Sequence, residues 1–222
     1  MTIRIGMLLF PQLTQLDLTG PYEVLARVPD ARISLVWKSL EPVVSGTGLE
    51  LRPNLTLRDA PQFDVLFVPG GSGQGPLSKD EEVLEFLRRQ GAGARYVTAV
   101  CTGSLLLGAA GLLRGYEATT HWAYHEFLRP LGAIPVRQRV VVDRNRVTGG
   151  GVTAGIDFGL RLAAELSSEE TARAIQLGLE YNPEPPFDSG SPEAAGPELV
   201  ARVRQRFSLT VEAFREIVAK IA

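Results

Sequence analysis

The chain has 222 residues, of which 45% are hydrophobic and 22% charged, so it can bury one sizeable core and is not expected to be disordered. Its 23 basic and 25 acidic side chains nearly cancel, and we therefore expect neither a nucleic acid nor a membrane as a partner. A single cysteine excludes a framework of intrachain disulfides, and we expect a cytoplasmic protein whose thiol stays reduced.

The first half of the chain predicts buried strands that alternate with helices. The N-terminal apolar run over residues 3–10 is interpreted as a strand and not as a signal peptide. A helix should follow, with Thr19 as its N-cap and Pro21 near its start. Further strands are expected at "RISLVWKS" and "DVLFVPGG", with a hairpin in "PVVSGTGLELRPNLTL" between them. The amphipathic pattern of "KDEEVLEFLRRQGA" predicts a helix that ends just before Gly91.

The second half continues the alternation. A buried strand is expected at "RYVTAV", a helix at "TGSLLLGAA", a short strand at "EATTHW" and a helical turn at "AYHEFLRPLGA". The stretch "RQRVVVDRNRVTGG" predicts two strands, and a long helical segment after it is expected to divide at Ser167 and Ser168. This order predicts an α/β fold, a three-layer α/β/α sandwich with a mostly parallel, flavodoxin-like sheet.

Composition divides the chain into three parts. Residues 1–181 are expected to form the catalytic unit, and residues 182–198, rich in proline, glycine, serine and acidic residues, an irregular linker. Residues 199–222 should form a helix with apolar side chains along one face at Leu199, Val203, Phe207, Val211, Phe214 and Val218. Such a stripe needs a surface to cover it. We expect that surface to be the partner subunit of a homodimer; packing against its own domain is the alternative.

The lone Cys101 lies where a strand is followed at once by a helix of small residues. This pattern is typical of a nucleophile elbow, a sharp turn at the carboxyl edge of the sheet, where α/β proteins bind ligands. A helix N-terminus favours the thiolate, so we expect a lowered thiol pKa and a nucleophilic cysteine. A buried structural cysteine is the alternative.

Two further segments contain candidates for the same site. In "FVPGGSG", the amides of Gly70 and Gly71 could join the amide of Thr102 in an oxyanion-binding hole, although plain turn chemistry is the commoner reason for such glycines. Ser72 follows them as a candidate substrate-binding residue. The spacing alone favours Asp17 as a helix cap; the alternative is a place beside the thiol, where its pKa would be raised and it could donate a proton.

The two histidines provide no clear catalytic pair. His121, in "TTHW", either approaches the cysteine in space or is a satisfied core or capping group, and the sequence favours neither. Two histidines and one cysteine offer no metal-ligand spacing, and we expect neither a metal nor another cofactor.

With "AVCTGSLLLGAAGLLRG" followed by "ATTHW", the chain resembles the ThiJ/PfpI superfamily, whose fold is related to class I glutamine amidotransferases. The resemblance extends from "IGMLLFPQLTQLDLTGPYEVLA" to "TGGGVTAGIDFGLRLAAEL", about the first 180 residues. Within the superfamily it is greatest to the isocyanide (isonitrile) hydratases, including in "THWAYHEFLRPLGAIPV" and "LEYNPEPPFDSGSP".

The resemblance implies a nucleophilic Cys101, a hydrogen-bonded acid at Asp17 and binding groups at Thr102 and Gly71. It also implies cofactor-independent hydration of a small isocyanide to an N-substituted formamide, in a homodimer. Superfamily members that act as peptidases or amidases usually have histidine directly after the cysteine. Thr102 stands there instead, which puts proteolysis and glutamine hydrolysis in doubt.

Three other functions remain open from the sequence. A redox or stress-response protein, or a glyoxalase-like enzyme, would use the same Cys101. A ligand-sensing domain related to AraC-type regulators shares "VCTGSLLLGAAGLL" and "ATTHW". The residues after Tyr181 show no pair of helix-turn-helix units, which argues against a free-standing regulator.

Overall fold

A seven-stranded sheet forms the centre of the computed structural model, which describes residues 2–221. Met1 and Ala222, the outer ends of the expected catalytic unit and C-terminal helix, lie outside the described residues. The strands are β1 (Ile3–Leu8), β2 (Ala31–Trp37), β5 (Leu55–Thr56), β6 (Val65–Val68), β7 (Tyr96–Val100), β10 (Val140–Asp143) and β11 (Arg146–Gly149). Their spatial order is β10-β11-β7-β6-β1-β2-β5.

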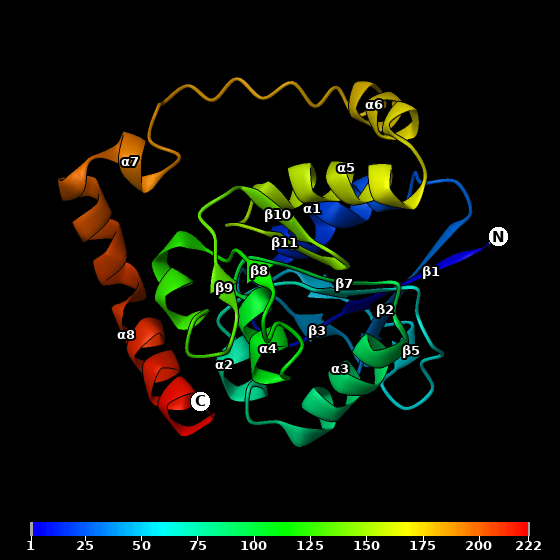
Figure 1. Cartoon of the computed structure of the whole chain (residues 1–222), viewed down its shortest axis with the longest axis horizontal. Helices are drawn as coiled ribbons and strands as arrows, with labels where there is room; N and C mark the ends of the chain where they lie inside the picture. The colour runs from blue at the N-terminus through cyan, green and yellow to red at the C-terminus, as the bar shows by residue number, and fades with distance from the viewer. Residues whose placement is uncertain (1, 222) are drawn as a thin grey trace.

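Helices cover both faces of this sheet. They are α1 (Gln15–Leu25), α2 (Gln74–Leu77), α3 (Glu81–Gly93), α4 (Gly103–Ala109), α5 (Ala154–Leu166) and α6 (Glu169–Gly178). Figure 1 shows α1 and α5 above the sheet and α3 and α4 below it. All neighbouring strands are parallel except β10 and β11. The predicted three-layer sandwich with a mostly parallel sheet is therefore confirmed.

The central strands are apolar along their length because both of their faces are covered. Every residue of β6 is buried, and so are the last four residues of β1 and of β7. The expected hairpin is also present, formed by β3 (Val43–Val44) and β4 (Glu50–Leu51). The helical segment divides where it was expected to, because Ser168 caps α6 by accepting the Thr171 N–H at 3.1 Å.

Two predicted helix boundaries were wrong. Helix α1 begins at Gln15 after an N-cap at Thr14, so Thr19 lies inside the helix, where its hydroxyl donates to the Gln15 side chain at 2.9 Å. The entry to α1 is set by a bond from the Thr14 N–H to the carbonyl of Gly70 (2.9 Å), which no local pattern reveals. Helix α3 continues past Gly91 to Gly93. A Cβ at Gly91 would lie 2.8 Å from the Leu112 side chain, so this glycine serves close packing and does not end the helix.

The C-terminal part consists of α7 (Pro192–Ala195), one turn inside the expected linker, and α8 (Pro197–Ile221). The second half of α8 packs against its own chain through Phe214, Ile217 and Val218, which are buried. Phe214 meets the ring of Phe127 at 5.1 Å between centroids, on the 3₁₀ helix η1 (Trp122–Phe127). The alternative of packing against its own domain therefore holds for this half of the stripe. The homodimer stays a prediction.

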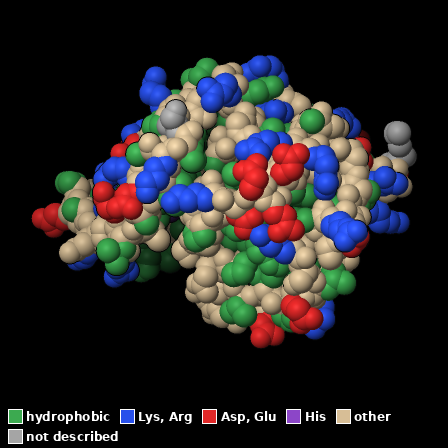
Figure 2. Space-filling view, turned by 90° about the horizontal axis from the view of Figure 1, so that it is seen from below, with side chains coloured by type: hydrophobic (Ala, Val, Ile, Leu, Met, Phe, Trp, Pro, Cys, Tyr) green, Lys and Arg blue, Asp and Glu red, His purple; other side chains and the backbone are tan. Residues whose placement is uncertain are grey.

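The surface mixes charges of both signs. Figure 2 shows basic and acidic side chains interspersed over the face seen from below, with the C-terminal part projecting at its left, as in Figure 1. Within residues 2–221, no helix is both long enough and apolar enough to cross a bilayer.

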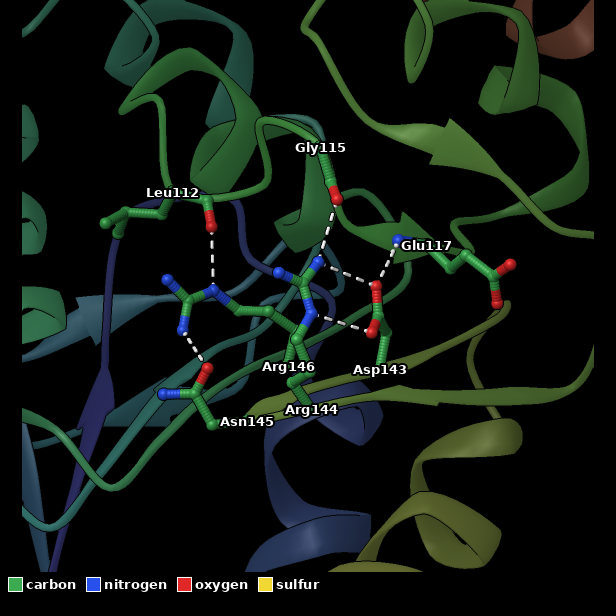
Figure 3. Close-up of polar contacts among 7 residues, drawn as sticks. All are labelled: Leu112, Gly115, Glu117, Asp143, Arg144, Asn145 and Arg146. Atoms are coloured by element: carbon green, nitrogen blue, oxygen red, sulfur yellow. Dashed lines mark hydrogen bonds and ion pairs between the residues drawn. The ribbon is translucent and has the colours of Figure 1, made fainter.

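A polar network connects the β10–β11 turn to residues 112–117 (Figure 3). The Arg144 guanidinium donates to the carbonyl of Gly115 at 2.8 Å and binds Asp143, whose carboxylate accepts the Glu117 N–H at 2.8 Å. Glu117 begins the short strand β8 (Glu117–Ala118), which pairs with β9 (Ile134–Pro135). The network thus holds Glu117, at the start of residues 117–121. His121, at the end of these residues, lies at the candidate active site.

Candidate active site

Cys101 occupies a sharp turn between β7 and α4. Its φ of 55° lies in the left-handed region, which is strained for a residue with a side chain and persists only where neighbours hold it. The Cys101 N–H donates to the carbonyls of Gly149 (3.0 Å) and Gly150 (2.9 Å), and the Thr120 hydroxyl donates to the Cys101 carbonyl at 2.7 Å. These bonds from both flanking segments fix the elbow that the sequence predicts.

Asp17 reaches the same place from the first turn of α1, where it is fully buried. Its Oδ2 accepts the Gly70 N–H at 3.1 Å, whereas Oδ1 has no partner among residues 2–221. A Cβ added at Gly70 would lie 2.8 Å from both Asp17 Oδ2 and Cys101 Cβ. Only glycine at this position lets the carboxyl and the thiol approach each other.

Burial governs the ionisation of this pair. Burial raises the pKa of Asp17 to about 7, although the hydrogen bonds that its carboxylate accepts from the Cys101 thiol and the Gly70 N–H act to lower it. Burial, and then the neighbouring Asp17 charge, raise the pKa of the Cys101 thiol well above its usual value. The expected lowering of the thiol pKa was therefore wrong, because loss of solvent outweighs the helix N-terminus. Two negative charges would repel in this site, so near neutral pH the pair holds at least one proton.

Backbone amides at the sulfur come from Thr102 and Val152, and their hydrogen bonds favour the thiolate. The glycine amides have other partners than expected: Gly70 donates to Asp17, and Gly71 donates to the Thr102 hydroxyl at 3.0 Å. They orient the acid and the threonine and do not point at a ligand. Sequence reasoning missed Val152, although it lies in "TGGGVTAG", a glycine-rich turn directly after a strand.

The two remaining predicted residues, Ser72 and His121, line the cavity described below. The His121 Nδ1 accepts the Ala123 N–H at 3.3 Å and caps η1, and its ring meets Phe207 edge-on at 5.3 Å between centroids. Burial lowers the pKa of His121 to about 4, so the imidazole is neutral at physiological pH. His121 is thus a capping group whose ring also forms part of the cavity wall.

A cavity of about 580 Å³ opens over Cys101 and Thr102. One wall comes from α8, which contributes Phe207, Thr210, Ala213, Phe214 and Ile217. The Tyr124 hydroxyl hydrogen-bonds to Thr210 and joins this wall to η1. The sequence predicted the α8 stripe but not its place at the cavity. In the part of the chain that the structure describes, no cluster of three or more His, Cys, Asp or Glu residues suits a metal ion.

This arrangement is suited to nucleophilic addition coupled to proton transfer. A thiol and a carboxyl lie in contact away from solvent, two amides face the sulfur, and the space above is mostly apolar. A small substrate bound there would meet a sulfur nucleophile and an acid at one point.

Comparisons with known proteins agree with the predicted superfamily. The model of the DJ-1/PfpI family matches residues 3–165. The curated isonitrile hydratase of Pseudomonas putida is 59% identical over 222 residues, which cover all of this chain and 97% of that protein. The HTH-type transcriptional regulator GbdR of Pseudomonas aeruginosa is 34% identical over 180 residues, which are 77% of this chain but only 48% of the regulator.

A solved structure shares nearly the whole fold. The crystal structure of a ThiJ/PfpI family protein from Pseudomonas syringae is 43% identical and superposes with a TM-score of 0.96, covering 98% of this chain and 91% of the other. With the family model, the full-length relative and this structure in agreement, the chain belongs to the DJ-1/PfpI family.

Proposed function

We propose that this chain is an isocyanide hydratase, which adds water to R–N≡C and releases an N-substituted formamide. The observation that carries the proposal is the buried Cys101–Asp17 pair, which shares a proton beneath a mostly apolar cavity. The terminal carbon of an isocyanide must gain both a nucleophile and a proton, and this pair supplies both at one point. The identity over the full length to an isonitrile hydratase supports the same function.

In the first half of the reaction, Asp17 accepts the thiol proton and the Cys101 sulfur attacks the terminal carbon. A carbon–sulfur bond forms, and the proton held by Asp17 passes to the same carbon. The triple bond becomes a double bond, which leaves the thioimidate Cys101–S–CH=N–R. The amides of Thr102 and Val152 stabilise the sulfur anion before attack. The pKa of Asp17, about 7, suits a group that takes up and returns a proton near neutral pH.

In the second half, water adds to the thioimidate carbon. One water proton goes to nitrogen, which gives R–NH–CH(OH)–S–Cys101. The carbon–sulfur bond then breaks, and the sulfur leaves with the bonding pair. The hydroxyl proton returns to the Cys101–Asp17 pair, and R–NH–CHO is released. The pair regains its starting protonation, and the whole route uses side chains of this chain and water.

The shape of the cavity also supports a small substrate with an apolar group on nitrogen. The α8 wall presents Phe207, Phe214 and Ile217 to the space above the thiol. We further propose a cytoplasmic homodimer with no nucleic-acid or membrane partner. The match to GbdR, at 34% identity, supports a sensor role less strongly than the 59% identity to an isonitrile hydratase supports the hydratase.

The test is turnover by the purified full chain. We expect it to convert benzyl isocyanide to N-benzylformamide, as followed by chromatography. We also expect Cys101→Ser to abolish turnover and Asp17→Asn to lower kcat by about 10²–10⁴-fold. Exposed Glu184 provides the control variant Glu184→Gln, which should act as the wild type does. Hydration of methylglyoxal without isocyanide turnover would reject the hydratase in favour of a glyoxalase-like enzyme.

A further inference from the structure

Gln74 is a buried side chain with an unused acceptor at the active-site cavity. It begins α2, its side chain lines the cavity, and the residue is only 3% exposed. Its Oε1 has no hydrogen-bond partner within the described part of the chain. Leaving a buried acceptor unpaired costs folding free energy, so such a group in a ligand cavity points to a partner that arrives with the ligand.

A second buried glutamine shows the usual arrangement. Gln90, on α3, is 2% exposed, and its Oε1 accepts the Phe63 N–H at 3.0 Å. Its Nε2 donates to the carbonyl of Pro61 at 2.8 Å. Both ends of this amide are satisfied by backbone groups. Gln74 differs from Gln90 in two respects: the residue lines the cavity, and its buried oxygen is unpaired.

Two hydrogen bonds connect the backbone of Gln74 to the turn that holds Cys101. The Gln74 N–H donates to the Gly71 carbonyl at 3.3 Å, and the Gly71 N–H donates to the Thr102 hydroxyl at 3.0 Å. Thr102 follows the nucleophile, and its amide faces the sulfur of Cys101. Gln74 and Cys101 also line one cavity. Gln74 is therefore a residue of the same cavity as the Cys101 nucleophile.

The chemistry of hydration, on which this inference rests, supplies a donor at one stage only. An isocyanide has no N–H, and neither has the thioimidate. The N–H appears when water adds, because the new carbon–oxygen bond places one water proton on nitrogen. We propose that Gln74 Oε1 accepts the hydrogen bond of this N–H. Gln74 thereby stabilises the water-addition step and leaves the bound isocyanide unaffected, which is the differential binding that raises kcat.

The test compares three variants of the full chain with the wild type. Gln74→Leu removes the acceptor at similar volume, Gln74→Glu keeps an oxygen there, and Gln90→Leu is the matched control. Turnover of benzyl isocyanide is quenched within milliseconds, and intact-protein mass spectrometry measures the fraction of chains that bear the thioimidate on Cys101. Thermal unfolding is measured on the same samples.

We expect Gln74→Leu to lower kcat about 100-fold, as removal of one transition-state hydrogen bond does, and to accumulate the adduct. Its midpoint of unfolding should equal or exceed that of the wild type, because no native hydrogen bond is lost. Gln74→Glu should recover most of the loss. Gln90→Leu should unfold at a lower temperature and keep the wild-type adduct fraction.

Other outcomes overturn the inference. Wild-type kcat in Gln74→Leu, or slow turnover with Cys101 free, means that Gln74 does not act in water addition. A lower unfolding midpoint for Gln74→Leu, without adduct, indicates a purely structural role. If the wild type itself forms neither adduct nor formamide, the proposed function fails, and the inference fails with it.

Discussion

Asp17 and His121 are both buried at the cavity, and burial displaces their pKa values in opposite directions. Asp17 has a folded-state pKa of about 7 against an ordinary 3.8, so the folded chain binds its proton more tightly than the unfolded chain does. Its contribution to stability is complete below pH 3.8 and is lost as pH rises to 7. His121, with its pKa lowered to about 4, contributes above pH 6.5, and that contribution is lost as pH falls through 4.

A change from Asp17 to Asn separates these two contributions, because only the first disappears. The shift of the Asp17 pKa corresponds to about 4 kcal/mol at most. The free energy of unfolding of Asp17→Asn, relative to that of the wild type, should therefore be higher at pH 8 than at pH 4 by up to that amount. Urea unfolding at the two pH values measures the gain. An equal difference at both pH values would mean that Asp17 titrates normally.

The individual residues of the site were predictable to different degrees. The break from strand to small-residue helix indicated Cys101, whereas spacing alone favoured a helix cap for Asp17, and only the family resemblance placed this acid beside the thiol. The direction of the thiol pKa was not predictable, because it depends on burial by elements far along the chain. Val152 was missed for a similar reason: its amide reaches the sulfur only because β11 lies beside β7.

At the scale of elements, α8 limits the volume of the cavity over the thiol. It follows an exposed linker, lies outside the residues that the family model matches, and still forms one wall of the cavity. Its apolar periodicity predicted a helix with one covered face. No periodicity predicts what covers that face, because that depends on where the linker places it. The start of α1 was missed likewise, since a distant carbonyl at Gly70 sets it.

We expect the α8 wall to select substrates by the size of the group on nitrogen. Ala213→Leu adds volume to the wall and should lower kcat/KM for benzyl isocyanide at least about tenfold, while methyl isocyanide stays within about threefold. Ala201→Leu makes the same change at an exposed position of α8 and should alter neither value. Equal losses for both isocyanides in Ala213→Leu would show that α8 does not sense the substituent.

For the whole molecule, the strand order explains how one site forms from distant segments. From β1 the chain moves outward to β2, and it then returns to place β6 and β7 on the other side of β1. The change of direction leaves a crevice at the carboxyl ends of β1 and β6. Asp17 follows β1, Gly70 follows β6 and Cys101 follows β7, so the crevice brings acid, glycine and thiol together.

The same view of the whole molecule bears on its assembly. Among the described residues, three large apolar side chains are more than three-quarters exposed: Leu177 on α6 (83%), Phe187 in the linker (78%) and Leu209 on α8 (86%). We expect a second copy of the chain to cover one or more of these side chains. Sedimentation equilibrium at micromolar concentration should give about twice the chain mass of 24.0 kDa. The triple variant Leu177→Ser, Phe187→Ser and Leu209→Ser should sediment as a monomer with an unchanged far-UV spectrum. A wild type that sediments at the chain mass would leave α8 with an intramolecular role alone.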